Sequence, residues 1–196
     1  MNLKRTVFSI LIVSILVAGC TTTRVALDYT PLSSPSAALQ SRPLVVVGRF
    51  ADNRGEPANW LGAIHGGYGN PLKNLEASQP VSDLVAKAFA DGLRARGLLA
   101  EGDRPYVLSG VIRRLDCNQY VRQEANADLQ VVLTEATSGR ELFSQSYKKE
   151  NVEGSLLSLK TGIFASVEDL RALTAKTLQQ VVDAALDDPA LRNALR

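Results

Sequence analysis

The side chains that most often carry out chemistry in proteins are scarce in this chain of 196 residues. It has two cysteines, Cys20 and Cys117, and one histidine, His65. A zinc site takes about four Cys, His or acidic ligands, and no Cys/His cluster is present to supply them. A serine hydrolase would need an activated serine beside His65, and the Gly-x-Ser-x-Gly signature is absent. We therefore expect no catalytic residue, no metal and no cofactor, and we predict that the chain is not an enzyme.

The first residues have the pattern of a secretory signal peptide. Lys4 and Arg5 are followed by an apolar run from Val7 to Val17 and by small residues that lead to Cys20. A positive start, a short apolar core and small residues before a cleavage site are the parts of such a signal. A membrane-spanning helix needs about 20 apolar residues, so this run is too short to remain as an anchor. We expect residues 1–19 to be removed.

The tetrad Val17-Ala18-Gly19-Cys20 resembles the lipobox of bacterial lipoproteins. This resemblance implies that Cys20 is acylated, with palmitate-like chains, and becomes the first residue of the mature chain. Two acyl chains give stable anchoring, because each buried methylene contributes about 0.8 kcal/mol. Thr21, where retained inner-membrane lipoproteins tend to have aspartate, implies the outer membrane, with the domain facing the periplasm. An ordinary signal peptide followed by a chance cysteine is the alternative.

The mature chain is expected to contain a tether and one domain. Residues 20–43 are rich in Thr, Ser, Pro and Ala, which is typical of a tether, and residues 44–196 are enough for one domain with a core. Without Lys4 and Arg5 the acidic and basic residues are equal in number and form no run of like charge, so we expect no binding to nucleic acid. Cys117 lacks an internal disulfide partner. We expect it to be buried, with pairing between chains as the alternative.

The apolar periodicity predicts the elements of the domain. Leu44–Phe50 reads as a strand buried on both faces, Pro80–Arg96 as an amphipathic helix, and Tyr106–Leu115 as a second strand. This order of elements allows a crossover unit, in which the two strands are parallel. We also expect an edge strand over 25–29, a hairpin over 127–149, a long helix from residue 166 and a short one over 190–196. The predicted fold is an α+β two-layer domain, in which two main helices pack on a small mixed sheet of four or five strands.

Residues 51–78 contain many glycines and prolines and are expected to form an irregular loop. The glycines of 62–69 do not lead directly into a helix, as those of a phosphate cradle do. Asp52 and Arg54 are expected to form a local ion pair or to cap a turn, with a catalytic role as the alternative. The apolar residues of the loop make it the predicted surface for a partner; they are Trp60, Leu61, Ile64 and Tyr68.

Several short segments, taken in their order and spacing, resemble the YajG family of bacterial lipoproteins. They are Ala51-Asp52-Asn53-Arg54, Leu93-Arg94-Ala95-Arg96-Gly97-Leu98, Ala127-Asp128-Leu129 and Asn151-Val152-Glu153-Gly154. The resemblance implies an outer-membrane anchor and a periplasmic domain, and it brings no activity and no catalytic residues. The layout is also similar to periplasmic α+β lipoprotein domains, such as activators of peptidoglycan synthases and the curli secretion lipoprotein. Likeness of fold alone does not establish function.

Three hypotheses follow from the sequence. The first is a non-catalytic domain, held at a membrane through the lipid on Cys20, that binds another cell-envelope component, either a protein or peptidoglycan. The second is a subunit of an envelope assembly or secretion complex that forms a ring or a pore. The third is a hydrolase that uses His65 or Cys117. The identity of the partner and the oligomeric state are open at this point.

Overall fold

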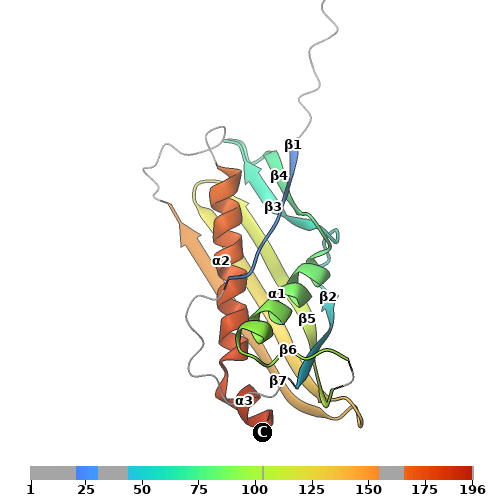
Figure 1. Cartoon of the computed structure of the whole chain (residues 1–196). Coiled ribbons are helices and arrows are strands. Elements are labelled where there is room, and N and C mark those ends of the chain that lie inside the picture. Colours follow the sequence, from blue (N-terminus) through green and yellow to red (C-terminus); the bar gives the residue numbers. More distant parts are fainter. Residues whose placement is uncertain (1–20, 31–43, 103, 155–165, 196) are drawn as a thin grey trace, which may run out of the picture.

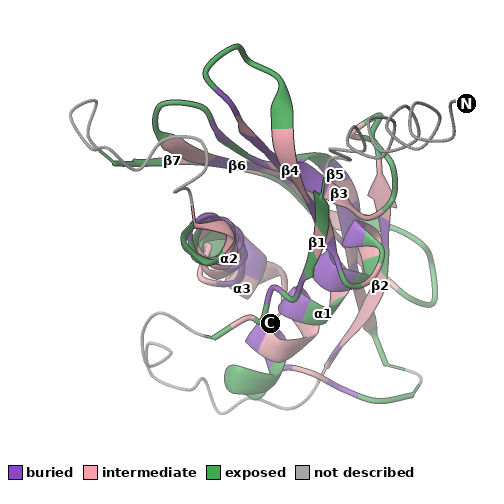
Figure 2. Cartoon of the chain, turned by 90° about the horizontal axis from the view of Figure 1, so that it is seen from above, coloured by how far each residue is buried: buried purple, intermediate pink, exposed green. Residues whose placement is uncertain are grey.

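The computed structural model describes residues 21–30, 44–102, 104–154 and 166–195. The predicted signal peptide, Cys20 and the second half of the predicted tether lie outside these described residues. The chain forms one strongly curved sheet, and the helices lie against its concave face (Figures 1 and 2). This α+β arrangement in two layers is the fold class that the sequence predicts.

The sheet has seven strands, which corrects the expected four or five. They are β1 (Thr21–Val25), β2 (Val45–Asp52), β3 (Trp60–His65), β4 (Pro71–Ala77), β5 (Tyr106–Gln119), β6 (Gln123–Glu135) and β7 (Glu141–Glu153). The strand order is β1-β4-β3-β5-β6-β7, and β2 also pairs with β5. The length of β5 makes this possible, because its first part pairs with β2 and its last three residues pair with β3, both in parallel. The predicted parallel pair of strands is therefore confirmed.

The predicted loop over 51–78 in fact contains the antiparallel strands β3 and β4. The sequence misleads here because glycines and prolines punctuate both strands, which are only six and seven residues long. The register also shifts between Trp60 and Gly62 and again between Ile64 and His65, so no regular alternation of apolar and polar residues develops. Pairing with the long strand β5 overrides these weak local preferences.

The span predicted as a tether begins with a strand of the sheet. β1 pairs in parallel with β4, from Thr21 opposite Lys73 to Val25 opposite Ala77. Val25 and Leu27 are each 7% exposed and belong to the core. The edge strand therefore covers Thr21–Val25 rather than residues 25–29, and in the described residues the folded domain begins at Thr21 rather than at Leu44.

The helices follow their sequence signals closely. They are α1 (Val81–Ala95), α2 (Val167–Leu186) and α3 (Pro189–Ala194). The hydroxyl of Ser166 caps α2 by accepting a hydrogen bond from the backbone nitrogen of Asp169, at 3.1 Å. The carboxylate of Asp188 caps α3 in the same way, from the backbone nitrogen of Ala190 at 2.7 Å. The apolar face of α1 is buried, and its Phe89 stacks on Phe50 of β2 with ring centroids 4.9 Å apart.

Candidate functional site

Several segments that are distant in the sequence meet at one end of the molecule. Strand pairing places Thr21 beside Lys73, next to the β3–β4 turn (residues 66–70), and joins Gln123 to both Gln119 and Glu153. We call this region the open end: it comprises the start of β1, the β3–β4 turn, the β5–β6 turn (120–122), the end of β7 and the first turns of α2. It is the upper end in Figure 1.

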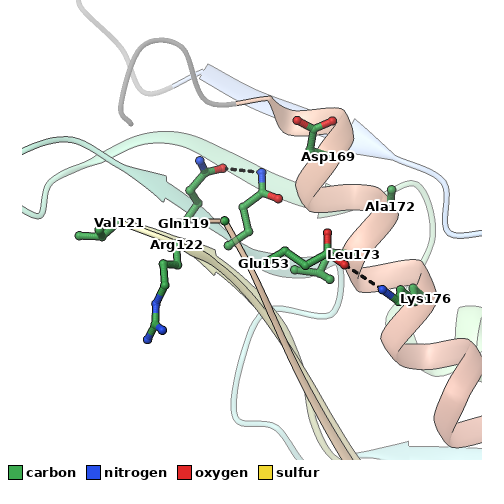
Figure 3. Close-up of a pocket in the computed structure, with 10 residues that line it drawn as sticks. Gln119, Val121, Arg122, Glu153, Asp169, Ala172, Leu173 and Lys176 are labelled. Atoms are coloured by element: carbon green, nitrogen blue, oxygen red, sulfur yellow. Dashed lines mark hydrogen bonds and ion pairs between the residues drawn. The ribbon is translucent and has the colours of Figure 1, made fainter. Parts of the chain in front are cut away.

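A pocket of about 520 Å³ opens between the β5–β6 turn, the end of β7 and α2 (Figure 3). Its polar side chains are amides and charges of both signs, and its apolar ones line the side formed by α2 and the turn. The lining residues are Gln119, Val121, Arg122, Gln123, Glu153, Gly154, Asp169, Ala172, Leu173 and Lys176. None of these described residues is a serine, a cysteine or a histidine, so they offer groups for binding and no hydroxyl or thiol nucleophile.

The polar groups of the pocket already interact with one another. The amide nitrogen of Gln123 donates to the side-chain oxygen of Gln119 at 3.1 Å, and the ammonium of Lys176 lies 2.8 Å from the carboxylate of Glu153 (Figure 3). The second contact joins α2 to β7. Both of its side chains are about half exposed, so the pair adds little stability and can exchange for contacts with a ligand.

The structure separates the four residues of the predicted partner surface. Leu61 and Ile64 are fully buried in the core, which corrects their assignment to a surface. Trp60 is half-buried at the start of β3. Tyr68 is fully exposed and lies in the turn that follows the end of β3 at His65. These residues therefore do not form one contact surface.

The two other candidates for chemistry lie at separate places. His65 is the last residue of β3 rather than part of a loop, and its Nδ1 is buried without a hydrogen-bond partner in the described part of the chain. Cys117 is 2% exposed, which confirms the expected burial, and this burial raises the pKa of its thiol to about 12. Among the described residues no group of three or more His, Cys, Asp or Glu side chains could hold a metal ion.

The predicted ion pair of Asp52 and Arg54 is confirmed, and it has a wider structural role. The Arg54 guanidinium lies 2.8 Å from the Asp52 carboxylate and also donates to the carbonyl oxygens of Trp60 and Leu115, at 2.7 and 3.0 Å. Hydrogen bonds from Arg54 hold the pKa of Asp52 below its usual value. The pair thus ties β2, β3 and β5 together.

A second buried charge cluster lies away from the open end and has no signal in the sequence, because its members are far apart along the chain. Arg96, whose side chain is 7% exposed, pairs with Asp183 at 2.9 Å and with Asp187 at 2.8 Å. The hydroxyl of Tyr29 accepts from Arg96 and donates to Asp183. Burial, followed by the hydrogen bond to Asp183, raises the pKa of Tyr29 to about 12. This cluster fastens the segment after β1 to α1 and α2.

The described residues contain no helix that is both long and apolar enough to cross a membrane.

The pocket could not be predicted from the sequence. Its lining comes from three strands, the β5–β6 turn and a helix, and the lining residues form no sequence motif. A charged or amide residue near a turn is common in proteins, and its membership of a pocket becomes visible only when its spatial neighbours are known.

No family model and no curated protein matches the chain by sequence. Among solved structures, a Xanthomonas campestris protein of the family described as DUF330 has a TM-score of 0.65 and 15% identity, over 87% of this chain and 96% of that one. An uncharacterized protein has a TM-score of 0.54 and 8% identity, over 85% and 97%. A minor lipoprotein from Acinetobacter baumannii has a TM-score of 0.39 and 12% identity, over 56% and 84%. The first two likenesses show that this fold occurs in other proteins.

Proposed function

We propose that the chain is a lipoprotein, anchored by acyl chains on Cys20 in a bacterial outer membrane, whose periplasmic domain binds another envelope component without catalysis. The observation that carries this proposal is that the residues directly after Cys20, Thr21–Val25, form strand β1 and pair with β4 in the sheet. Cleavage before Cys20 would leave every strand of the described sheet intact, including its first. All described strands thus lie on the carboxyl side of the expected processing point.

The family assignment belongs to the same proposal. The segments that resemble the YajG family include Asp52 and Arg54 and the end of β7, and both lie at structurally important places: the buried ion pair and the rim of the pocket. The fold shared with the DUF330 protein is compatible with more than one family of this kind, so the family is proposed on the sequence segments alone.

The lipid anchor can be tested by mass spectrometry of the protein purified from its membrane. We expect an amino-terminal peptide that begins at Cys20 and carries two modifications, a diacylglycerol on sulfur and an acyl chain on the amine. Cys20→Ser should abolish both. Thr21 is exposed, so Thr21→Asp should not disturb the fold. This variant should be found in the inner-membrane fraction when the membranes are separated on a density gradient. An unmodified sulfur or another cleavage point would remove the basis of this proposal.

The binding partner would be found by crosslinking in living cells. Ala172 and Ala184 are both exposed alanines on α2, and only the first lines the pocket. They lie about 18 Å apart along the helix. A photoreactive residue at position 172 should capture an envelope protein or peptidoglycan fragment that the same residue at 184 does not. Equal capture at the two positions would show that the pocket does not select the partner.

A second candidate function, a subunit of an envelope assembly, is favoured by the edge of β7. Within the described residues this strand of 13 residues pairs with β6 alone, which leaves its outer edge as a template for another strand. Lys148, Lys149 and Glu150 place charges along it, and charges on an edge oppose such pairing. Analytical ultracentrifugation of the Cys20→Ser mature chain distinguishes the two functions: a stable large oligomer supports assembly, and a monomer supports the binding domain.

A further inference from the structure

The exposed large apolar side chains of the described residues gather at the open end. They are Tyr68, Tyr120, Val121 and Val152, at 101%, 45%, 37% and 41% exposure. Tyr68 lies in the β3–β4 turn, Tyr120 and Val121 in the β5–β6 turn, and Val152 pairs with Glu124 just beyond that turn. Single exposed apolar residues need no explanation, but their collection at one end does.

The two turns are held together as one unit. The hydroxyl of Tyr120 donates a hydrogen bond of 2.8 Å to the carbonyl oxygen of Gly67. Each turn closes a pair of antiparallel strands, and β3 and β5 are themselves paired next to the turns, at Ile64 and Gln119. The apolar side chains of the two turns are therefore carried by strands that are joined to each other.

The position of β1 brings the same end close to the proposed anchor. Thr21 pairs with Lys73, two residues after the start of β4 at Pro71, so β1 begins beside the β3–β4 turn (Figure 1). Cys20 precedes Thr21 directly, and one extended residue spans at most about 3.6 Å. With β1 in the sheet, no length of free chain separates a lipid on Cys20 from the open end.

We propose that the open end rests in the headgroup region of the bilayer, with Tyr68 and Tyr120 as its interfacial side chains. This inference rests on the proposed lipid anchor at Cys20. Tyrosine is enriched at membrane interfaces because it combines an apolar ring with a polar tip. The acyl chains supply the attachment, and the turns set the orientation of the domain, so that the pocket beside the β5–β6 turn opens close to the membrane surface.

The charges at this end indicate which bilayer surface fits. Arg122 and Lys176 are accompanied by Glu124, Glu153 and Asp169, and ion pairs join Arg122 to Glu124 and Lys176 to Glu153. Among the described residues this mixture gives no positive patch that anionic lipids would attract. The contact therefore depends on the apolar interface and should change little with salt or with the share of anionic lipid.

Fluorescence quenching by lipids with a nitroxide at the headgroup tests the orientation. Trp60 is the single tryptophan, so Trp60→Phe provides a silent background. In that background, Tyr68→Trp should be quenched at least roughly twofold more than Ser138→Trp, which lies in the β6–β7 turn at the opposite end, because interfacial aromatic side chains settle at headgroup depth. Vesicles of phosphatidylethanolamine with a minor share of phosphatidylglycerol serve as the bilayer.

Two arms separate this inference from the anchor on which it rests. The first uses the lipidated protein, with its acyl chains confirmed by mass spectrometry. The second uses the unlipidated mature chain coupled through the thiol of Cys20 to a maleimide lipid, since Cys117 is buried and protected from the reagent. The proposed orientation is overturned if the tryptophans at positions 68 and 138 are quenched equally in either arm. It is also overturned if self-association of the chain shields the tryptophan at position 68 from the lipid quencher. An absence of native acyl chains overturns the anchor and, with it, the native membrane contact, whereas the second arm tests the orientation of the domain by itself.

Discussion

Arg54 shows how a single side chain can hold several strands in place. Its guanidinium has five N–H donors in a rigid plane, and here they reach the carboxylate of Asp52 and the carbonyl oxygens of Trp60 and Leu115. The side chain is 3% exposed. A buried cation is tolerated at this place because nearly every donor has an acceptor.

Arg54→Ala is expected to lower the free energy of unfolding by about 3 to 5 kcal/mol, because it leaves the Asp52 charge and the carbonyl groups without their partner. Urea denaturation would measure the loss. Arg113→Ala is the matched control: its side chain is 45% exposed, and it should cost less than about 1 kcal/mol. Similar losses in the two variants would show that the Arg54 cluster has no special role.

The same pair predicts a dependence of stability on pH. Arg54 lowers the pKa of Asp52, and Arg96 lowers that of Asp187, so the folded state takes up these protons less readily than the unfolded state does. Their stabilising effect is complete above the ordinary carboxyl pKa of about 3.9 and is lost as the pH falls through the lowered values. Urea denaturation between about pH 2 and pH 7 should give Asp52→Asn a flatter profile than the wild type. Parallel profiles would contradict the linkage.

Cys117 is expected to be inert in the folded protein. The thiolate is the reactive form, and burial raises the pKa of this thiol to about 12. In Cys20→Ser, a thiol reagent at pH about 8 should therefore modify Cys117 at least roughly a hundredfold more slowly than in the same protein unfolded in urea, because exposed thiols have a pKa of about 8.5. Rapid labelling of the folded protein would show that the site opens.

At the scale of elements, the β3–β4 hairpin depends on Gly62. A Cβ atom at this position would lie 1.7 Å from the carbonyl oxygen of Cys117, and the φ angle of 157° adds strain for other residues. The obstacle is backbone of the neighbouring strand β5, which cannot turn aside as a side chain can. Glycine is what allows β3 to approach β5 so closely.

Gly62→Ala is therefore expected to destabilise the protein by at least about 3 kcal/mol, at the upper end of the cost of overpacking. Gly67→Ala, in the turn of the same hairpin, has nothing within 4 Å of the added atom and should be close to neutral. Thermal unfolding followed by circular dichroism would compare the two. A mild effect at position 62 would mean that β3 can leave β5 at little cost.

At the scale of the whole molecule, the segment 21–29 acts as part of the fold. Val25 and Leu27 enter the core, and Tyr29 joins the buried cluster of Arg96 and Asp183. The segment therefore links the outermost strand of the sheet to both long helices. Because this segment directly follows Cys20, a lipid there would be attached to the folded body itself.

Leu27→Ala is expected to lower the free energy of unfolding by about 2 to 5 kcal/mol, as loss of a buried leucine side chain does. Ala26→Ser, at the exposed neighbouring position, should stay within about 0.5 kcal/mol of the wild type. Chemical denaturation of the unlipidated mature chain would measure both. If both variants had an equally small effect, residues 21–29 would be a tether and would not contribute to the stability of the domain.

A structural feature could be predicted from the sequence when the interactions that produce it join residues close together along the chain. The helix that starts after Ser166 and the one that includes Phe89 were predictable, because capping and apolar spacing act within a few residues. The ion pair of Asp52 with Arg54 was predictable from their closeness in the sequence, and the parallel pairing of β2 with β5 from the strand–helix–strand order of the elements. The open-end pocket was not, because its lining is brought together from β5, the following turn, β6, β7 and α2.

The class of fold and the burial of Cys117 could be predicted from the sequence by itself, since these depend on residue type and local pattern, and the proposed anchor at Cys20 rests on the sequence alone. The tertiary structure alone decided that residues 51–78 contain a hairpin, that Thr21–Val25 belongs to the sheet, and that the turns carrying Tyr68 and Tyr120 are joined at the end of the sheet where Thr21 lies. The physical reason is that strand pairing joins residues distant in sequence. Its stabilisation outweighs the local preference of a glycine-rich or threonine-rich segment for an irregular path.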